Sequence, residues 1–145
     1  NMAITSAVCN SFKQEILEAE HNFATSGGNT FNLALYDEDA VLSKSTTVYT
    51  TSEELATTGG YTAKGNALTS VTPVLDSDTA VCDFANSSWT SASFTARGCL
   101  IFNDSHSSDA AVCAIDFGGD KTSTAGSFTI TFPTADASNA VIRIA

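Results

Sequence analysis

The chain of 145 residues is poor in positive charge. Six Lys and Arg residues stand against 16 Asp and Glu residues, which gives a formal net charge of −10 and an isoelectric point near 4.2. A nucleic-acid-binding surface needs clustered Lys and Arg to neutralise phosphates, and anionic membrane surfaces repel an acidic protein. The composition therefore predicts a protein that binds neither nucleic acid nor a membrane.

Long apolar segments are missing as well. No run approaches the roughly 18 consecutive apolar residues of a membrane-spanning helix. The N-terminal residues also lack the charged region and the apolar region that together make a secretory signal. The sequence thus favours synthesis in the cytosol.

The four cysteines, Cys9, Cys82, Cys99 and Cys113, lack the C-x-x-C spacing of metal and redox motifs. Three of them lie in apolar, strand-like runs. Free buried thiols, one disulfide and a metal site are the three alternatives. The spacing and the apolar neighbours favour free thiols that serve as small core residues.

Common catalytic and nucleotide-binding motifs are also absent, including the nucleophile elbow, the phosphate-binding glycine loop and the metalloprotease helix. The loop 103–109 contains Ser, His and Asp, but the members of a triad meet in space rather than along one flexible loop. A small hydrolase that depends on His106 is the remaining enzymatic alternative. The carboxylates of 37–39 lack calcium-loop spacing and indicate a solvated turn. We therefore expect no enzyme, no catalytic, cofactor-binding or metal-ligating residue, and no cofactor.

The sequence is rich in hydroxyl side chains, with 38 Ser and Thr residues. Thr favours strands and Ser favours turns, so the composition favours a mainly β fold. A length of 145 residues suits a single domain with one core. We predict an antiparallel β-sandwich or jelly-roll-like barrel with one N-terminal helix, at about 11–23, and a short helical turn near 52–56.

The N-terminal part divides into an arm and a helix. Residues 1–10 lack turn chemistry and suit an extended arm that gains structure against a partner or against the chain's own sheet, while residues 11–145 form the single β-rich domain. Ser11 and Gln14 resemble a capping box. Phe12 and Phe23 begin and end an apolar stripe with helical spacing, which indicates a helix covering a sheet or, alternatively, binding a partner.

Alternating or continuous apolar runs predict the strands. Pro73 indicates an edge position or the end of its strand, and Trp89 is expected in the core or at its border. The last run should pair with 128–132 and 110–117, and Lys121–Gly126 should form a solvated hairpin tip. The predicted strands are 30–36, 68–74, 79–84, 87–96, 99–102, 110–117, 128–132 and 140–144.

Two regions are the expected contacts with a partner. One is the arm, and the other is the polar excursion 37–66, where a β-domain can reach outward to another molecule. Tyrosines beside carboxylate-rich loops also fit a second possibility, a carbohydrate- or receptor-binding module. The candidate contact residues are Ala3, Ile4, Val8, Tyr36, Tyr49, Leu55 and Tyr61.

Two long segments carry a resemblance to a known group of proteins. They are FNLALYDEDAVLSKSTTVYTTSEELATTGGYTAKGNALTSVTP (31–73) and FTARGCLIFN…AVCAIDFGGDKTSTAGSFTITFPTADASNAVIRIA (94–145). Their most specific parts are the order ALY…TTVYTT…E…GGYTAKG and the closing DFG-DKTSTAG-FTI-FP-ADASNAVIRIA. In these segments the chain resembles the small virion structural proteins of tailed bacteriophages.

The resemblance implies a non-enzymatic role in the virion. It implies a decoration or cement protein on the outer surface of the capsid, assembled in the host cytoplasm, with the major capsid protein as its partner. Self-association as a dimer or trimer is also expected, because symmetry multiplies weak contacts. A tail- or fibre-associated module, structural or binding carbohydrate or a receptor, is the alternative within the same group.

Overall fold

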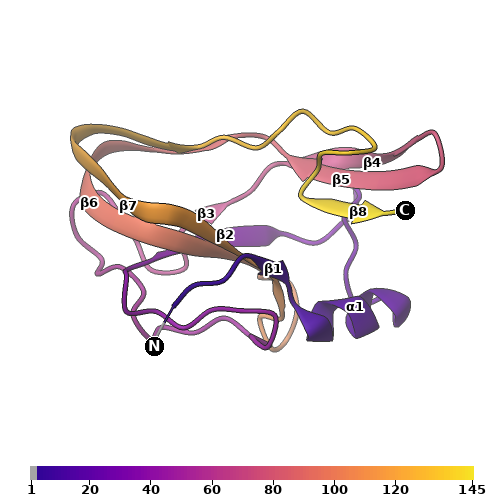
Figure 1. Cartoon of the computed structure of the whole chain (residues 1–145), viewed down its shortest axis with the longest axis horizontal. Coiled ribbons are helices and arrows are strands. Elements are labelled where there is room, and N and C mark those ends of the chain that lie inside the picture. The colour runs from indigo at the N-terminus through magenta and orange to yellow at the C-terminus, as the bar shows by residue number, and fades with distance from the viewer. Residues whose placement is uncertain (1–2) are drawn as a thin grey trace.

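The computed structural model describes residues 3–145 and is mainly β, with two antiparallel sheets and one short helix (Figure 1). The predicted β-sandwich is confirmed, but the sheets have free edges and do not close into a barrel. The sheet orders are β1-β7-β6-β2-β3 and β4-β5-β8. The elements are β1 (Ala7–Val8), α1 (Asn10–Leu17), β2 (Phe31–Tyr36), β3 (Asn66–Ala67), β4 (Ser70–Asp76), β5 (Thr79–Phe84), β6 (Ser87–Asn103), β7 (Ala111–Ile130) and β8 (Ile142–Ile144).

The long strands β6 and β7 pair along almost their whole length and pass from one layer of the sandwich to the other (Figure 1). Each was predicted as two separate strands. They stay continuous because bulges bend a strand without ending its pairing, and the register of this ladder shifts at four places. The prediction of a hairpin tip at Lys121–Gly126 is therefore wrong, because Lys121 pairs with Ala96 and Gly126 with Ala92.

The strand β2 is buried on both faces, although its sequence alternates as if one face were exposed. Phe31 stacks on Phe23 of the α1–β2 connection, with ring centroids 4.3 Å apart. On the neighbouring residue, the Asn32 side-chain amide donates a hydrogen bond to the Lys64 carbonyl at 3.2 Å. Segments distant in sequence thus cover the polar positions, which no local pattern encodes.

The helix α1 is shorter than predicted and ends at Leu17 rather than near residue 23. Its N-cap residue is Cys9, without a side-chain cap, so the predicted Ser11 cap is also wrong. After the helix, Ala19 adopts a left-handed φ of 60°, which turns the chain so that His21 and Phe23 enter the core. Among residues 3–145, no helix is long and apolar enough to cross a membrane.

The C-terminal strand β8 pairs with β5 in the smaller sheet. The prediction that it pairs with residues of β7 is therefore wrong. Ile142 lies opposite Cys82 and Ile144 opposite Ala80. Ile142 is buried, whereas Ile144 is 59% exposed, so only Ile142 belongs to the core. On the far side of β5, β4 is an exposed edge strand, as Pro73 indicated.

The N-terminal segment is part of the folded body from Ile4 onward and not a free arm. Ile4 forms a parallel bridge with Leu42 and is buried. The Ile4 side chain packs over Gly98. A Cβ atom added to Gly98 would lie only 2.6 Å from Cδ1 of Ile4. The strand β1 then pairs with β7, with Val8 opposite Cys113. The apolar side chains of the arm therefore gain their structure against the chain's own sheet.

Shortening Ile4 tests whether the arm is packed in solution. Ile4→Val is expected to lower the free energy of unfolding by about 1 kcal/mol, because a buried methyl group is lost. Urea unfolding followed by tryptophan fluorescence measures the change. The matched control Ile144→Val, at a residue that is 59% exposed, should change it by less than about 0.5 kcal/mol. Equal, negligible effects of both variants would contradict the packing of the arm.

The prediction of free buried thiols is confirmed, since all four cysteines are unpaired and buried. Burial raises the pKa of Cys9 to about 11 and those of Cys82 and Cys113 to about 12. The pKa of Cys99 is also raised by burial, well above its ordinary value. The thiols are therefore protonated at neutral pH and act as small apolar core residues.

Candidate partner-binding groove

An apolar hollow lies between the two halves of β7. We call it the β7 groove. Its walls come from β1, from both halves of β7 and from the segment that follows β7, and its volume is about 710 Å³. Its apolar lining includes Val8, Ile115, Phe117, Ile130, Pro133 and Val141.

The groove opens because β7 changes layer in its middle. Asp116 pairs with Gly98 and Lys121 with Ala96, so β7 has more residues than β6 between these two pairs. Gly118 lies within this bulge at a φ of 81°, a conformation that glycine adopts without steric cost. The two halves of β7 consequently form opposite walls of the same hollow.

Aromatic rings from β6 and β7 pack at the base of the groove. Phe128 is 5.0 Å from Phe94, 6.1 Å from Trp89 and 6.4 Å from Phe117, measured between ring centroids. Trp89 is buried, which confirms its predicted place in the core. These contacts hold the groove-lining Phe117 and Phe128 against residues of the adjacent strand, so the base of the groove is a preformed apolar surface.

The chemistry of the lining suits an apolar partner segment. Besides apolar residues its lining includes Thr129, Thr131 and one charged residue, Lys121. No protein-family model, curated protein or solved structure matches this chain. Function is therefore inferred from the resemblance in 31–73 and 94–145, from the groove and from the charge of the chain.

The predicted contact residues of the arm lie in different environments. Ala3 is exposed, and its carbonyl accepts a hydrogen bond from the Leu42 amide. Ile4 is buried within the chain and offers no surface to a partner, because it packs over Gly98. Val8 is half-buried and lines the β7 groove. Of these three residues, only Val8 belongs to the groove.

Tyr36, at the end of β2, and the tyrosines of the excursion 37–66 do not form an exposed aromatic surface. Tyr36 and Tyr61 are buried, and Tyr49 and Leu55 are half-buried against the core. Burial raises the pKa values of all three tyrosines above their ordinary value. Buried Tyr36 and Tyr61 cannot serve as surface contacts, and the carbohydrate-binding alternative loses the exposed tyrosines that favoured it.

The Glu54 carboxylate links three parts of the excursion through hydrogen bonds. Its carboxylate accepts hydrogen bonds from the hydroxyls of Tyr49 and Tyr61 and from the backbone amide of Lys64, the last at 2.7 Å. The Tyr61 oxygen in turn accepts the Leu35 amide of β2 at 3.0 Å. The region near 52–56 forms a hydrogen-bonded turn rather than the predicted helical one, because Glu54 points inward to this network.

The acidic residues of the excursion form an exposed group around Asp37. The Asp37 carboxylate accepts the Asp39 amide at 2.9 Å, in the turn that the sequence predicted. The negative charge of Asp37 raises the pKa of the nearby Glu53 carboxyl. Repulsion from the neighbouring carboxylate is the main cause of this shift.

The loop 103–109 connects β6 and β7 as the expected hairpin, but its Ser and His side chains do not form a nucleophile–base pair. The Ser105 hydroxyl accepts the Thr30 amide at 2.8 Å. His106 instead directs Nε2 toward Glu20, at 3.2 Å from Oε1, and its Nδ1 accepts the Ser108 amide at 3.1 Å. His106 is thus positioned by Glu20, a residue 86 positions earlier in the chain.

Sequence reasoning missed most residues of the groove. Ile115, Phe117 and Ile130 were assigned to strands, but nothing in their alternation indicates that they share one open hollow. The adjacent glycines Gly118 and Gly119 in the middle of an apolar stretch were the available signal, because glycine within a strand often marks a bulge.

Proposed function

We propose that this chain is a structural protein of a phage virion that binds the outside of the capsid and stabilises it. Support comes from the resemblance in 31–73 and 94–145 and from a β-sandwich that carries one large apolar groove. The groove is the observation on which the proposal rests. Its occupant is an extended apolar segment of the major capsid protein.

The edge of β7 explains why an extended segment fits. On one side β7 pairs with β6 from Ala111 to Ile130, whereas on the other side the described residues of β1 pair only with Cys113 and Ala114. An extended peptide can add to such an edge through its main chain while its side chains enter the groove. The β7 groove therefore combines free strand edge with apolar surface.

The net charge of the chain indicates which residues flank the capsid segment that binds the groove. The chain has a net charge of −10, so an approaching surface rich in Lys and Arg is attracted and an acidic one is repelled. An apolar stretch flanked by basic residues on the capsid protein has the matching chemistry. The same negative charge keeps the chain away from packaged DNA.

Stabilisation of the shell follows from mass action. A protein that binds the mature, expanded capsid surface better than the unexpanded one shifts the lattice toward the expanded form and raises its resistance to heat. Copies joined as a dimer or trimer would bind several sites at once and hold more tightly than single copies. Analytical ultracentrifugation of the free protein measures this association.

Binding to undecorated heads tests the proposal. Purified protein should co-sediment with heads in a fixed stoichiometry and raise their melting temperature. Val8→Asp and Val141→Asp place a charge in the groove and are expected to weaken binding at least about tenfold, which corresponds to about 1.4 kcal/mol. Both residues are half-buried, so circular dichroism must first show that the variants are folded.

The control is the same substitution elsewhere. Val74→Asp changes a residue that is 55% exposed on the edge strand β4, outside the groove, and should leave head binding unchanged. Failure of the unmodified protein to bind would contradict the capsid role. Binding that Val8→Asp and Val141→Asp leave intact would contradict the groove as its contact. A glycan array that retains the protein instead would favour a receptor-binding module.

A further inference from the structure

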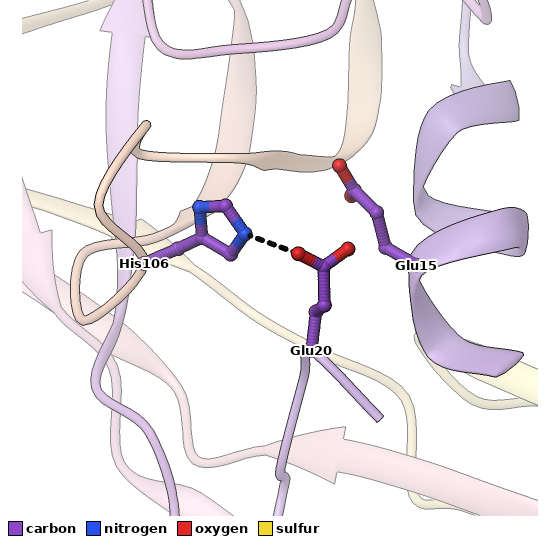
Figure 2. A group of neighbouring side chains, drawn as sticks. All are labelled: Glu15, Glu20 and His106. Carbon is purple, nitrogen blue, oxygen red and sulfur yellow. Dashed lines mark hydrogen bonds and ion pairs between the residues drawn. The ribbon is translucent and has the colours of Figure 1, made fainter. Parts of the chain in front are cut away.

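The side chains of Glu15, Glu20 and His106 point toward one another from three separate segments (Figure 2). Glu15 lies on α1, Glu20 in the connection from α1 to β2, and His106 in the β6–β7 loop. One ligand atom from each residue lies within 4.8 Å of the others. We propose that this group binds one divalent transition-metal ion, and that Zn²⁺ is the ion it fits best.

The early end of α1 brings the two carboxylates together. Helical continuation would place Glu20 on a different face from Glu15, because five residues rotate a helix by well over one turn. Instead Ala19 has a φ of 60°, and the Glu20 amide donates to the Glu15 carbonyl at 3.0 Å. The chain thus folds back at the end of the helix, and Glu20 returns to the side of Glu15.

A buried relay orients Glu15. The Asn103 side-chain oxygen accepts the Ser105 amide at 3.0 Å, so its NH₂ group faces Nδ1 of His21, also at 3.0 Å. Nδ1 must therefore accept, the proton resides on Nε2, and His21 donates to Oε1 of Glu15 at 2.9 Å. Asn103 and the His21 side chain are fully buried. Such hydrogen bonds behind a ligating carboxylate are typical of metal sites.

The relay leaves the second oxygen of Glu15 available. Within residues 3–145, no hydrogen bond engages Oε2 of Glu15 or Oε2 of Glu20. The exposed fractions of the side chains are 19% for Glu15, 41% for Glu20 and 16% for His106. Glu15 is therefore held by the buried His21, while all three side chains remain partly exposed to solvent. An ion can enter from solvent and keep a water ligand.

His106 changes tautomer when the ion binds. In the metal-free protein its Nδ1 accepts the Ser108 amide, so Nε2 carries the proton and faces Glu20. Coordination through Nε2 moves this proton to Nδ1 and leaves the total number of protons unchanged. The Ser108 amide lies on an exposed loop and can then donate to water, which makes the change inexpensive.

The ligand set determines the class of ion. One imidazole nitrogen and two carboxylate oxygens, with a fourth position open to water, resemble an open zinc site. Calcium and magnesium prefer oxygen ligands alone, so the imidazole favours a transition metal. Tetrahedral zinc holds its ligand atoms about 3.4 Å apart, a separation that small side-chain rotations of Glu20 and His106 would reach.

Calorimetric titration of the chelator-treated full chain with ZnCl₂ tests the proposal. One ion per chain is expected to bind and to raise the melting temperature, whereas CaCl₂ should do neither. His106→Ala and Glu20→Gln should each weaken Zn²⁺ binding at least about tenfold. The matched control Glu18→Gln changes an exposed glutamate next to the group and should bind Zn²⁺ as the unmodified chain does.

A second readout separates this site from adventitious binding elsewhere. Imidazole ¹⁵N chemical shifts of His106 should report the change from an Nε2–H to an Nδ1–H tautomer on saturation with Zn²⁺, while His21 keeps its proton on Nε2. Absence of Zn²⁺ binding, or binding that His106→Ala and Glu20→Gln leave unchanged, would overturn the proposal. Neither result bears on the capsid role, which is tested through the groove.

Discussion

Raising the pH above 9 is expected to unfold this protein through its four buried thiols. Each thiol has an ordinary pKa of 9.0, which burial raises to about 11 for Cys9 and about 12 for Cys82 and Cys113, with Cys99 also raised. Between these values the unfolded chain releases protons that the folded chain retains. Stability is therefore fully present below pH 9 and decreases as the pH rises toward 11 to 12.

The size of this effect follows from linkage between proton binding and folding. Each thiol removes about 1.4 kcal/mol of unfolding free energy per pH unit in that window, so four thiols acting together exceed the margin of a typical domain within about two units. Urea denaturation under reducing conditions at a series of pH values from 7 to 11 measures the decrease.

Removing thiols provides the control. The double variant Cys99→Ala, Cys113→Ala should begin with lower stability at pH 7, because volume is lost in the core. Between pH 9 and 10 its stability should then fall about half as steeply as that of the unmodified chain. Above pH 10 the three tyrosines, whose ordinary pKa of 10.0 is raised by burial, add to the slope of both proteins. A slope identical to that of the unmodified chain between pH 9 and 10 would contradict the thiol explanation, because the tyrosines contribute only above their ordinary pKa of 10.0.

Replacing Glu54 by alanine is expected to destabilise the excursion 37–66 and lower the unfolding free energy by about 3 kcal/mol. The substitution leaves three donors without their acceptor, namely the hydroxyls of Tyr49 and Tyr61 and the Lys64 amide. An unsatisfied buried donor costs about 1 to 3 kcal/mol, and Tyr61 is only 2% exposed. Chemical denaturation measures the loss.

The neighbouring glutamate is a matched control. Glu53 is exposed, and the charge of Asp37 raises the pKa of its carboxyl. Glu53→Ala should therefore be neutral or slightly stabilising, since it removes a repulsion and no buried contact. Limited proteolysis adds a local readout, because Glu54→Ala should expose the excursion to cleavage before the rest of the chain. Equal effects of both alanine variants would contradict the role assigned to Glu54.

Local patterns were sufficient for several elements. The strand 79–84 was predicted with the bounds that β5 has, and the loop 103–109 was predicted as a hairpin between two strands. Pro73 correctly indicated an edge strand, since proline lacks an amide for a second neighbour. These features depend on contacts between residues a few positions apart, and a local sequence pattern is sufficient to predict such contacts.

Long-range pairing was where local patterns failed. The strand 140–144 is apolar enough to pair with any edge, and the choice of β5 rather than β7 depends on how the chain returns after β7. Lys121–Gly126 is as polar as a hairpin tip, yet it lies within a ladder whose bulges keep it paired. Polar composition indicates that a segment is exposed to solvent. It does not distinguish an exposed strand from an exposed loop.

The candidate sites were the least predictable features. His106 was evaluated only against the Ser and Asp of its own loop, whereas its partner is Glu20, 86 residues away in sequence. The tyrosines were assigned to a surface because they flank polar loops, but a single inward-pointing carboxylate, Glu54, satisfies two of their hydroxyls. A satisfied hydroxyl lets a tyrosine enter the core.

The sequence by itself determined the class of fold, the acidity of the chain, the burial of the thiols and the position of the 103–109 turn, because composition and short-range periodicity control these properties. Only the tertiary structure decided that the arm from Ile4 joins the core, that the halves of β7 face each other across a groove and that Glu15, Glu20 and His106 meet. Each of these depends on which distant segments become neighbours, and that is set by the packing of the whole chain at once.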